Sequence, residues 1–298
     1  MPKLSSIVDT EELDNLYADK AIVYVEGESD EAVFTVLAGP DIGDRLEFKV
    51  PKTGGSGYHA VRDRVLEERG RGNAKIHGLL DGEASASFGH ILHLIENRET
   101  LFQTTDPALE GLIFLSETEL ENLILCHAGV AEFLTNNVTL AGIGGQDLEA
   151  HRSDLVSLSQ RFYLLAMMKF AAGELHRTGM PCKQVDKLAG RFQTTESTLK
   201  ITREIKASIE KDGGDWNAFV TKLNELMGRV RERFTDDGTR PPPKERQVRR
   251  LADGKGLLKR VIGKNNGQRN WEGHLVERLR QSPYAADFRQ ALLHETGA

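Results

Sequence analysis

Carboxylate side chains follow three short apolar segments of this 298-residue chain, each within a few residues of the point where the segment ends. They are Glu26 after residues 21–25, Asp81 and Glu83 after residues 76–80, and Glu117, Glu119 and Glu121 after residues 112–115. Acids this dense would repel one another and raise one another's pKa values unless divalent cations held them ionised. Carboxylate oxygens are ligands that suit Mg²⁺ and Mn²⁺. One or two such ions could lower the pKa of an attacking water and stabilise a leaving oxygen, which is the chemistry of phosphodiester cleavage.

The first of these groups is the most crowded, because four acids occur between residues 26 and 31. An anionic ligand would be repelled there, which argues against a phosphate-binding loop. Ser29 is expected to cap a helix whose first turn holds Asp30 and Glu31, and acids are favoured in the first turn of any helix. This alternative accounts for Asp30 and Glu31 but not for Glu26, which follows the apolar segment directly. The stretch alone leaves a metal site and an ordinary helix start as equal alternatives.

The C-terminal part of the chain supplies positive charge. Residues 240–280 contain twelve Lys and Arg against four Asp and Glu, although the whole chain has a net charge of −6. Such asymmetry indicates a phosphate-backbone surface, and the alternative is a solvated helix face that balances the acidic part of the chain. Lys255 lies between two glycines, which favours the functional interpretation. A cation would steady the charge that develops on a phosphate, and Lys255 is the first candidate, followed by Lys49 and Lys52.

The apolar segments alternate with helical patterns over the first 120 or so residues, which predicts βα units and a parallel sheet with helices on its faces. Strands are expected at residues 21–25, 46–50, 76–80 and 112–115. Their carboxyl ends would lie at one edge of the sheet, so that acids far apart in sequence could converge there. Helices are expected at residues 119–135, 147–179, 195–211 and 215–234. The sequence therefore predicts an α/β fold with a mainly helical C-terminal half.

The predicted organisation has three parts. They are a metal-binding catalytic domain at residues 1–125, a helical region at residues 126–235 and a basic helical region at residues 236–298. The net charge argues against an indiscriminate nucleic-acid-binding protein but allows an enzyme with a local basic groove. Only two cysteines occur, and neither a signal peptide nor an apolar run of membrane-spanning length is visible. We therefore expect a cytoplasmic protein that does not bind membranes.

Two of the acidic motifs resemble those of the TOPRIM domain, the metal-binding α/β module of topoisomerases, DnaG-type primases and OLD-family nucleases. The motifs are Val25-Glu26-Gly27-Glu28-Ser29-Asp30 and Asp81-Gly82-Glu83. Residues 119–123 and 254–258 also resemble the single-chain TOPRIM-like proteins that accompany a separate ATPase in bacterial anti-phage systems. The TOPRIM motifs cover residues 21–125, and the likeness over the helical middle is one of layout.

The resemblance implies a toxic, metal-dependent endoribonuclease that a partner ATPase holds inactive and that cuts host tRNA after infection is sensed. It implies that Glu26 is the leading catalytic and metal-binding acid. The further metal ligands that it implies are Asp30, Asp81, Glu83 and Glu121. Many TOPRIM domains carry Asp-x-Asp where this chain has Asp81 and Glu83, and the longer arm of Glu83 could shift the ion.

Several alternatives stay open. Glu119 and Glu121 open one helix, and only one of them is expected to face the sheet edge and bind the Mg²⁺ or Mn²⁺. A DNA nuclease of the OLD type would use the same chemistry, and a non-catalytic module that regulates an ATPase is a different class of protein. The apolar run at residues 162–168 predicts a buried helix, or else a homodimer or partner surface.

Overall fold

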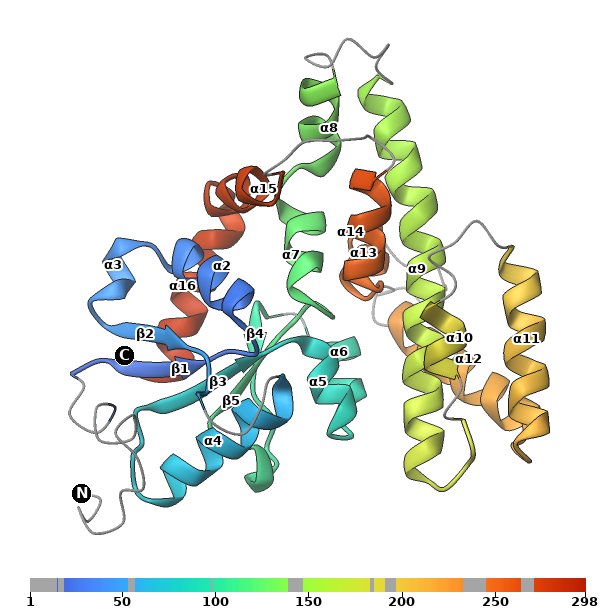
Figure 1. Ribbon diagram of the computed structural model, residues 1–298, viewed down its shortest axis with the longest axis horizontal. Helices are drawn as coiled ribbons and strands as arrows, with labels where there is room; N and C mark the ends of the chain where they lie inside the picture. The colour runs from blue at the N-terminus through green and yellow to red at the C-terminus, as the bar shows by residue number, and fades with distance from the viewer. Residues whose placement is uncertain are drawn as a thin grey trace. The chain divides into compact units, whose positions relative to one another are not determined.

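The computed structural model describes residues 15, 19–52, 57–97, 99–138, 147–182, 185–190, 197–232, 245–263 and 271–298. The chain is an α/β protein with a helical C-terminal half, as the sequence predicts (Figure 1). It divides into two compact units, each discontinuous in sequence. The first comprises residues 1–84, 98–116 and 272–298, and the second comprises residues 85–97 and 117–271.

The first unit contains a five-stranded sheet. Its strands are β1 (Ala21–Tyr24), β2 (Leu46–Lys49), β3 (Ile76–Leu80), β4 (Leu101–Phe102) and β5 (Leu112–Leu115). They lie in the order β2-β1-β3-β5-β4, and β4 runs antiparallel to β5 at one edge. The four predicted parallel strands are confirmed. The short strand β4 was not expected, because two residues are too few to give a periodic pattern.

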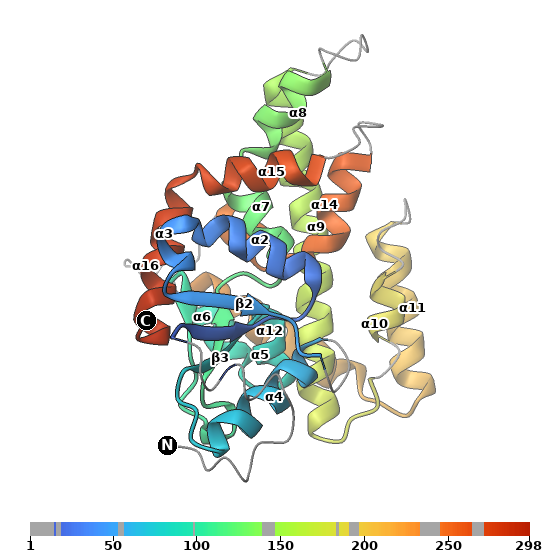
Figure 2. The same ribbon diagram turned by 60° about the vertical axis from the view of Figure 1, so that its left-hand side comes forward.

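Helices cover both faces of this sheet. Figures 1 and 2 show α4 (Tyr58–Gly70) on one face, with α2 (Glu28–Ala38) and α16 (Pro283–Thr296) on the other. β3 approaches α4 closely at Gly78, where a Cβ atom would come within 2.8 Å of side chains of α4 and β5. On the opposite face, the ring of Phe34 stacks on those of Phe48 and Phe288 at 5.9 and 5.7 Å. This contact joins α2, β2 and α16 in one apolar core.

The second unit is helical and is built around the 30-residue helix α9 (Leu148–Arg177). The other helices of this unit are α6 (Ile91–Glu96), α7 (Leu120–His127), α8 (Val130–Val138), α10 (Val185–Gly190), α11 (Thr198–Lys211), α12 (Trp216–Glu232), α13 (Glu245–Arg250) and α14 (Gly254–Gly263). α8, α10, α12, α13 and α14 pack against α9, and α7 packs against α13 and α14. Phe162, Leu165 and Met168 of α9 are buried, so the apolar run at residues 162–168 lies in a buried part of a helix, as predicted.

Short elements complete the described chain: α3 (Pro40–Gly43), α5 (Gly82–Ser87), the 3₁₀-helix η2 (Pro107–Leu109) and α15 (Trp271–Arg280). The single helix predicted at residues 119–135 is wrong, because α7 and α8 are separated at Gly129, which has a φ of +63°. Residues 272–298 belong to the first unit, together with the sheet. The three regions expected from the sequence follow one another along the chain and do not describe such a return. They stay a prediction. Among the described helices, none is both long and apolar enough to cross a membrane.

Candidate active site

Glu26 and Asp81 follow two neighbouring parallel strands, β1 and β3. Tyr24 pairs with Gly78, so two further residues along each chain bring Glu26 level with Leu80, next to Asp81. The chain passes from β1 to β2 on one side and then crosses to β3 on the other side, so β1 and β3 flank the topological switch point of the sheet. Ligands of open α/β sheets bind outside the carboxyl ends of the strands at such a point.

Backbone groups orient Glu26. The Asp81 N–H donates to Glu26 Oε1 at 3.3 Å, and the Gly57 N–H donates to the Glu26 carbonyl oxygen at 3.2 Å. Gly57 has a φ of +83°, and a Cβ atom built there would lie 4.0 Å from Glu26 Oε2. Glu26 itself is half-buried. Its carboxylate is therefore held by its surroundings and still partly exposed to solvent.

Asp30 and Glu83 lie in the first turns of α2 and α5, the helices that follow β1 and β3. Both are half-buried, and the Ser29 hydroxyl donates to Asp30 Oδ1 at 3.2 Å. The prediction that Ser29 caps α2 is wrong, because the helix begins at Glu28 and Gly27 takes the N-cap position. The Gly27 carbonyl accepts the Asp30 backbone N–H at 3.1 Å, which fixes the first turn of α2 directly after β1.

The donors at this edge of the sheet fit a hard divalent cation in their chemistry, because they are carboxylate oxygens. Within the described ranges, however, no three Asp, Glu, His or Cys side chains lie close enough together to hold an ion. In the first unit, the hydrogen bond from the Asp81 N–H to the Glu26 carboxylate is the part of the predicted site that the structure assembles. Binding of Mg²⁺ or Mn²⁺ by these residues stays a prediction.

Glu119 belongs to the second unit, where it joins the N-termini of two helices. It is the N-cap of α7 and forms a capping box with Asn122. Its Oε2 also accepts the Lys255 backbone N–H, in the first turn of α14, at 2.8 Å. Asn122 Nδ2 donates to the carbonyl oxygens of Arg249 and Ala252 at 2.7 and 3.1 Å. These hydrogen bonds hold the start of α7 against the turn between α13 and α14.

The Lys255 side chain is 62% exposed, and its Nζ lies 4.0 Å from Glu119 Oε1. Asp253 supports the same helix start: its Oδ1 accepts the Gly256 N–H at 2.8 Å, and its Oδ2 pairs with Lys169 Nζ at 2.6 Å. Burial and then the Asp253 carboxylate raise the pKa of Glu119, and Lys255 and Lys169 oppose that rise. The fold therefore fixes the backbone of Lys255 and leaves its ammonium group exposed, as contact with a phosphate would require.

The other two acids near the start of α7 differ in burial. Glu121 is half-buried in the first turn of α7. Glu117, which follows β5, is 2% exposed, and its Oε1 lies 3.5 Å from His127 Nε2. Desolvation and then Glu117 raise the pKa of the Cys126 thiol to about 12. The thiol is therefore protonated, which agrees with a structural role for Cys126 and His127.

The secondary cation candidates, Lys49 and Lys52, lie in the first unit. Lys49 Nζ donates to Asn15 Oδ1 at 2.9 Å and lies 3.8 Å from Glu47 Oε2. Asn15 Nδ2 donates in turn to the buried Tyr24 hydroxyl at 2.7 Å. Lys49 is therefore part of a structural network, whereas Lys52 is exposed.

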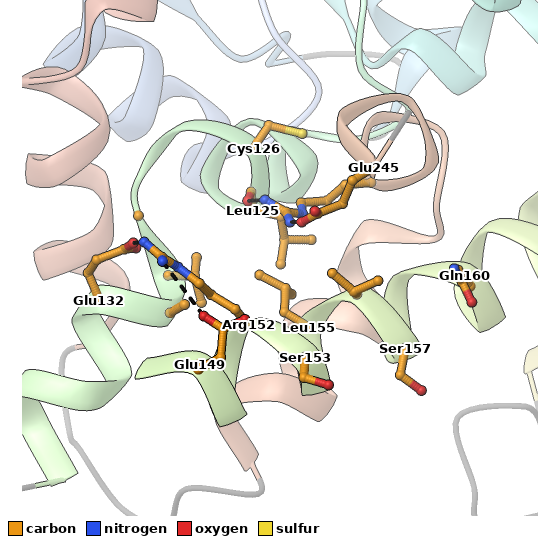
Figure 3. Close-up of a pocket in the computed structure, with 15 residues that line it drawn as sticks. Leu125, Cys126, Glu132, Glu149, Arg152, Ser153, Leu155, Ser157, Gln160 and Glu245 are labelled. Carbon is orange, nitrogen blue, oxygen red and sulfur yellow. Dashed lines mark hydrogen bonds and ion pairs between the residues drawn. The ribbon is translucent and has the colours of Figure 1, made fainter. Parts of the chain in front are cut away.

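A pocket of about 650 Å³ opens among α7, α8, α9 and α13 in the second unit. Figure 3 shows Arg152 and Glu132 meeting at one end of it, where they form an ion pair at 2.7 Å. Arg249, which also lines the pocket, pairs with Glu245. Both guanidinium groups are thus neutralised by carboxylates, and the Cys126 thiol beside them is protonated. The charged groups that line the described pocket are therefore engaged with one another, and nothing ties this pocket to the predicted acids.

The structure therefore brings predicted site residues together in two places: Glu26 with Asp81 in the first unit, and Glu119 with Lys255 in the second. Asp253 and Lys169 were missed. Asp253 could have been found, because an Asp directly before Gly254 is a helix N-cap signal. Lys169 could not, because it lies 84 residues away in sequence from the carboxylate that it contacts.

Comparison with known proteins adds no assignment. No protein-family model matches the sequence. No curated protein matches it either. The fold and the geometry of the site are therefore the basis for the function proposed below.

Proposed function

We propose that this protein is a divalent-metal-dependent endonuclease of the TOPRIM type. The observation that carries the proposal is the contact between Glu26 Oε1 and the Asp81 N–H at the switch point between β1 and β3. The acidic first turn of α2, with Glu28, Asp30 and Glu31, favours a cation there over a directly bound phosphate. Phosphodiester hydrolysis is the reaction that such a set of carboxylates serves best.

Each residue has a role in this proposal. Glu26, Asp30, Asp81 and Glu83, all of the first unit, would hold the ion. Glu119 and Glu121 belong to the second unit and stay candidate ligands from the sequence alone. When bound, Mg²⁺ or Mn²⁺ supplies a more acidic water and stabilises charge on the phosphate. Glu26, oriented by the Asp81 N–H, would accept the proton of the attacking water. Lys255 on α14 is the proposed cation for the phosphate.

RNA is the proposed substrate, with host tRNA favoured, through the resemblance to AriB, the effector nuclease of the PARIS anti-phage system. On this proposal an AriA-like ATPase holds the protein inactive until infection is sensed. The same chemistry on DNA, as in OLD-type nucleases, is the first alternative. The second alternative is a non-catalytic TOPRIM module that regulates an ATPase. The acids that follow three of the strands argue against a module without catalytic activity.

Expression in a bacterial host tests the proposal, with the wild type beside Glu26→Ala and with total small RNA and genomic DNA examined on gels. Growth arrest and tRNA fragments in the wild type alone are expected. Degraded DNA with intact tRNA would favour the OLD-type alternative. If neither form cleaves nucleic acid, alone or with the partner ATPase, the nuclease proposal is wrong.

A further inference from the structure

α14 presents a positively charged side to solvent. Its ten residues include Lys255, Lys259 and Arg260 and no acidic residue. Lys255 and Lys259 are exposed and lie one helical turn apart, about 6 Å along the helix axis. The opposite side of α14 is buried through Leu257 and Leu258. The helix is therefore amphipathic, with a polar side that is purely cationic.

Arg161 on α9 extends this positive charge, because α9 packs against α14. Arg161 and Arg260 are both half-buried. Burial and then the positive charge of Arg260 lower the pKa of Arg161. In the described part of the chain, neither Lys259 nor Arg260 forms an ion pair. Like charges held close together raise the energy of the fold, and an anion bound between them would lower it.

Other cations of the second unit are used within the fold. Arg250 is 4% exposed and donates to two backbone carbonyls of α6 at 3.0 and 3.1 Å. Arg249 pairs with Glu245, and on α11 Lys206 lies 3.7 Å from Glu210. Lys259 and Arg260 of α14 differ from these cations, because among the described residues neither of them forms an ion pair.

We propose that Lys255, Lys259 and Arg260 of α14, together with Arg161 of α9, form a phosphate-binding surface that holds the phosphodiester backbone of a nucleic acid. This inference rests on the proposed function and names the part of the second unit that binds the substrate. A row of cations along a helix suits a polyanion better than a single small anion. Backbone contacts of this kind position a strand without reading its sequence, so we expect binding that depends strongly on salt.

The test is the binding of a fluorescently labelled tRNA transcript, measured by anisotropy over a series of NaCl concentrations in the presence of EDTA. The variants are Lys259→Ala/Arg260→Ala and, because Arg260 is half-buried, Lys259→Glu alone. Lys206→Ala/Lys211→Ala on α11 is the matched control. The slope of log K against log salt should fall by about two in the first variant and about one in the second, and it should stay unchanged in the control.

The inference is overturned if the wild type does not bind tRNA at low salt, or if both variants keep the wild-type slope. Cleavage by the wild type is measured separately in Mn²⁺, so the two proposals can fail independently. Binding that depends on α14 without any cleavage would support this surface and contradict the nuclease. Cleavage with unchanged binding in the variants would support the nuclease and contradict this surface.

Discussion

Glu26 is the residue on which the proposed chemistry depends most. Its place at the end of a strand could be predicted, because the apolar run and the acid adjoin in the sequence. Its bond with the Asp81 N–H could not, since the two residues are 55 positions apart and meet because β1 and β3 are neighbours. The prediction of the N-cap of α2 was wrong. Serine is a favoured N-cap residue, which pointed to Ser29, but Gly27, with an extended backbone, takes the N-cap position two residues earlier.

At the residue scale, His77 should make stability depend on pH. It is 6% exposed, and burial followed by Arg69 lowers its pKa from 6.5 to about 4, against the opposing Thr296 carbonyl. The folded protein therefore keeps His77 neutral where the unfolded chain already binds a proton. Its contribution to the free energy of unfolding is complete above pH 6.5 and declines as the pH falls towards 4, by on the order of 3 kcal/mol.

Urea denaturation above pH 6.5 and near pH 4 measures this effect. His77→Leu should lose less stability between the two conditions than the wild type does. His176→Leu, at an exposed position of α9, is the control and should behave like the wild type. Equal losses in His77→Leu and the wild type would show that this histidine does not couple stability to pH.

At the scale of elements, the contact between α7 and α14 gives structural roles to Glu119 and Gly254. In the sequence, Glu119 is a candidate metal ligand and Gly254 is one of the two glycines beside Lys255. Glu119 and Asn122 bond the start of α14 and its preceding turn, and Gly254 packs against Asn122. The sequence predicts a helix that starts at Glu119, and the structure adds the capping box between Glu119 and Asn122. The contact between the two helices could not be predicted. The segments that form it are more than 120 residues apart in sequence, and no pattern in either segment indicates the other as its partner.

Gly254→Ala should destabilise this contact. The added Cβ would lie 2.8 Å from Asn122 Cγ and 3.1 Å from the Asn122 backbone nitrogen. Asn122 cannot move freely, because its side chain bonds to three backbone groups. We expect a loss of about 1–3 kcal/mol in the free energy of unfolding, measured by urea denaturation.

Gly173→Ala is the matched control. Gly173 lies inside α9, and a Cβ there meets no atom within 4 Å. It should stabilise the protein by up to about 1 kcal/mol through helix propensity. If Gly254→Ala is as stable as Gly173→Ala, the close packing of Gly254 on Asn122 has no energetic weight.

At the scale of the whole molecule, the C-terminal helix returns to the sheet with which the chain begins. The four parallel strands were predictable from short apolar runs, each bounded by turn residues. The packing of α16 in the sheet unit could not be predicted. The sequence of α16 indicates a helix with an apolar side but does not indicate which element covers that side. α13 and α14 belong to the second unit and α16 to the first, and the region expected at residues 236–298 stays a prediction.

Phe288→Ala tests this closure of the sheet unit. Phe288 is fully buried in α16, and its ring lies 5.7 Å from that of Phe34. The truncation should cost about 3–5 kcal/mol in the free energy of unfolding. Leu199→Ala, at a position that is 61% exposed, should change it by less than about 0.5 kcal/mol. Similar values for the two variants, measured by urea denaturation, would mean that α16 does not complete the core.

The most direct test of the nuclease is cleavage of tRNA by the purified protein with Mg²⁺ or Mn²⁺ added after EDTA treatment. Three proteins are compared: the wild type, Glu26→Gln, and Glu28→Gln as the control at an exposed acid two residues away. The predicted result is metal-dependent cleavage by the wild type and Glu28→Gln, and none by Glu26→Gln. Metal-dependent cleavage that survives in Glu26→Gln at the wild-type rate would contradict the catalytic role assigned to Glu26.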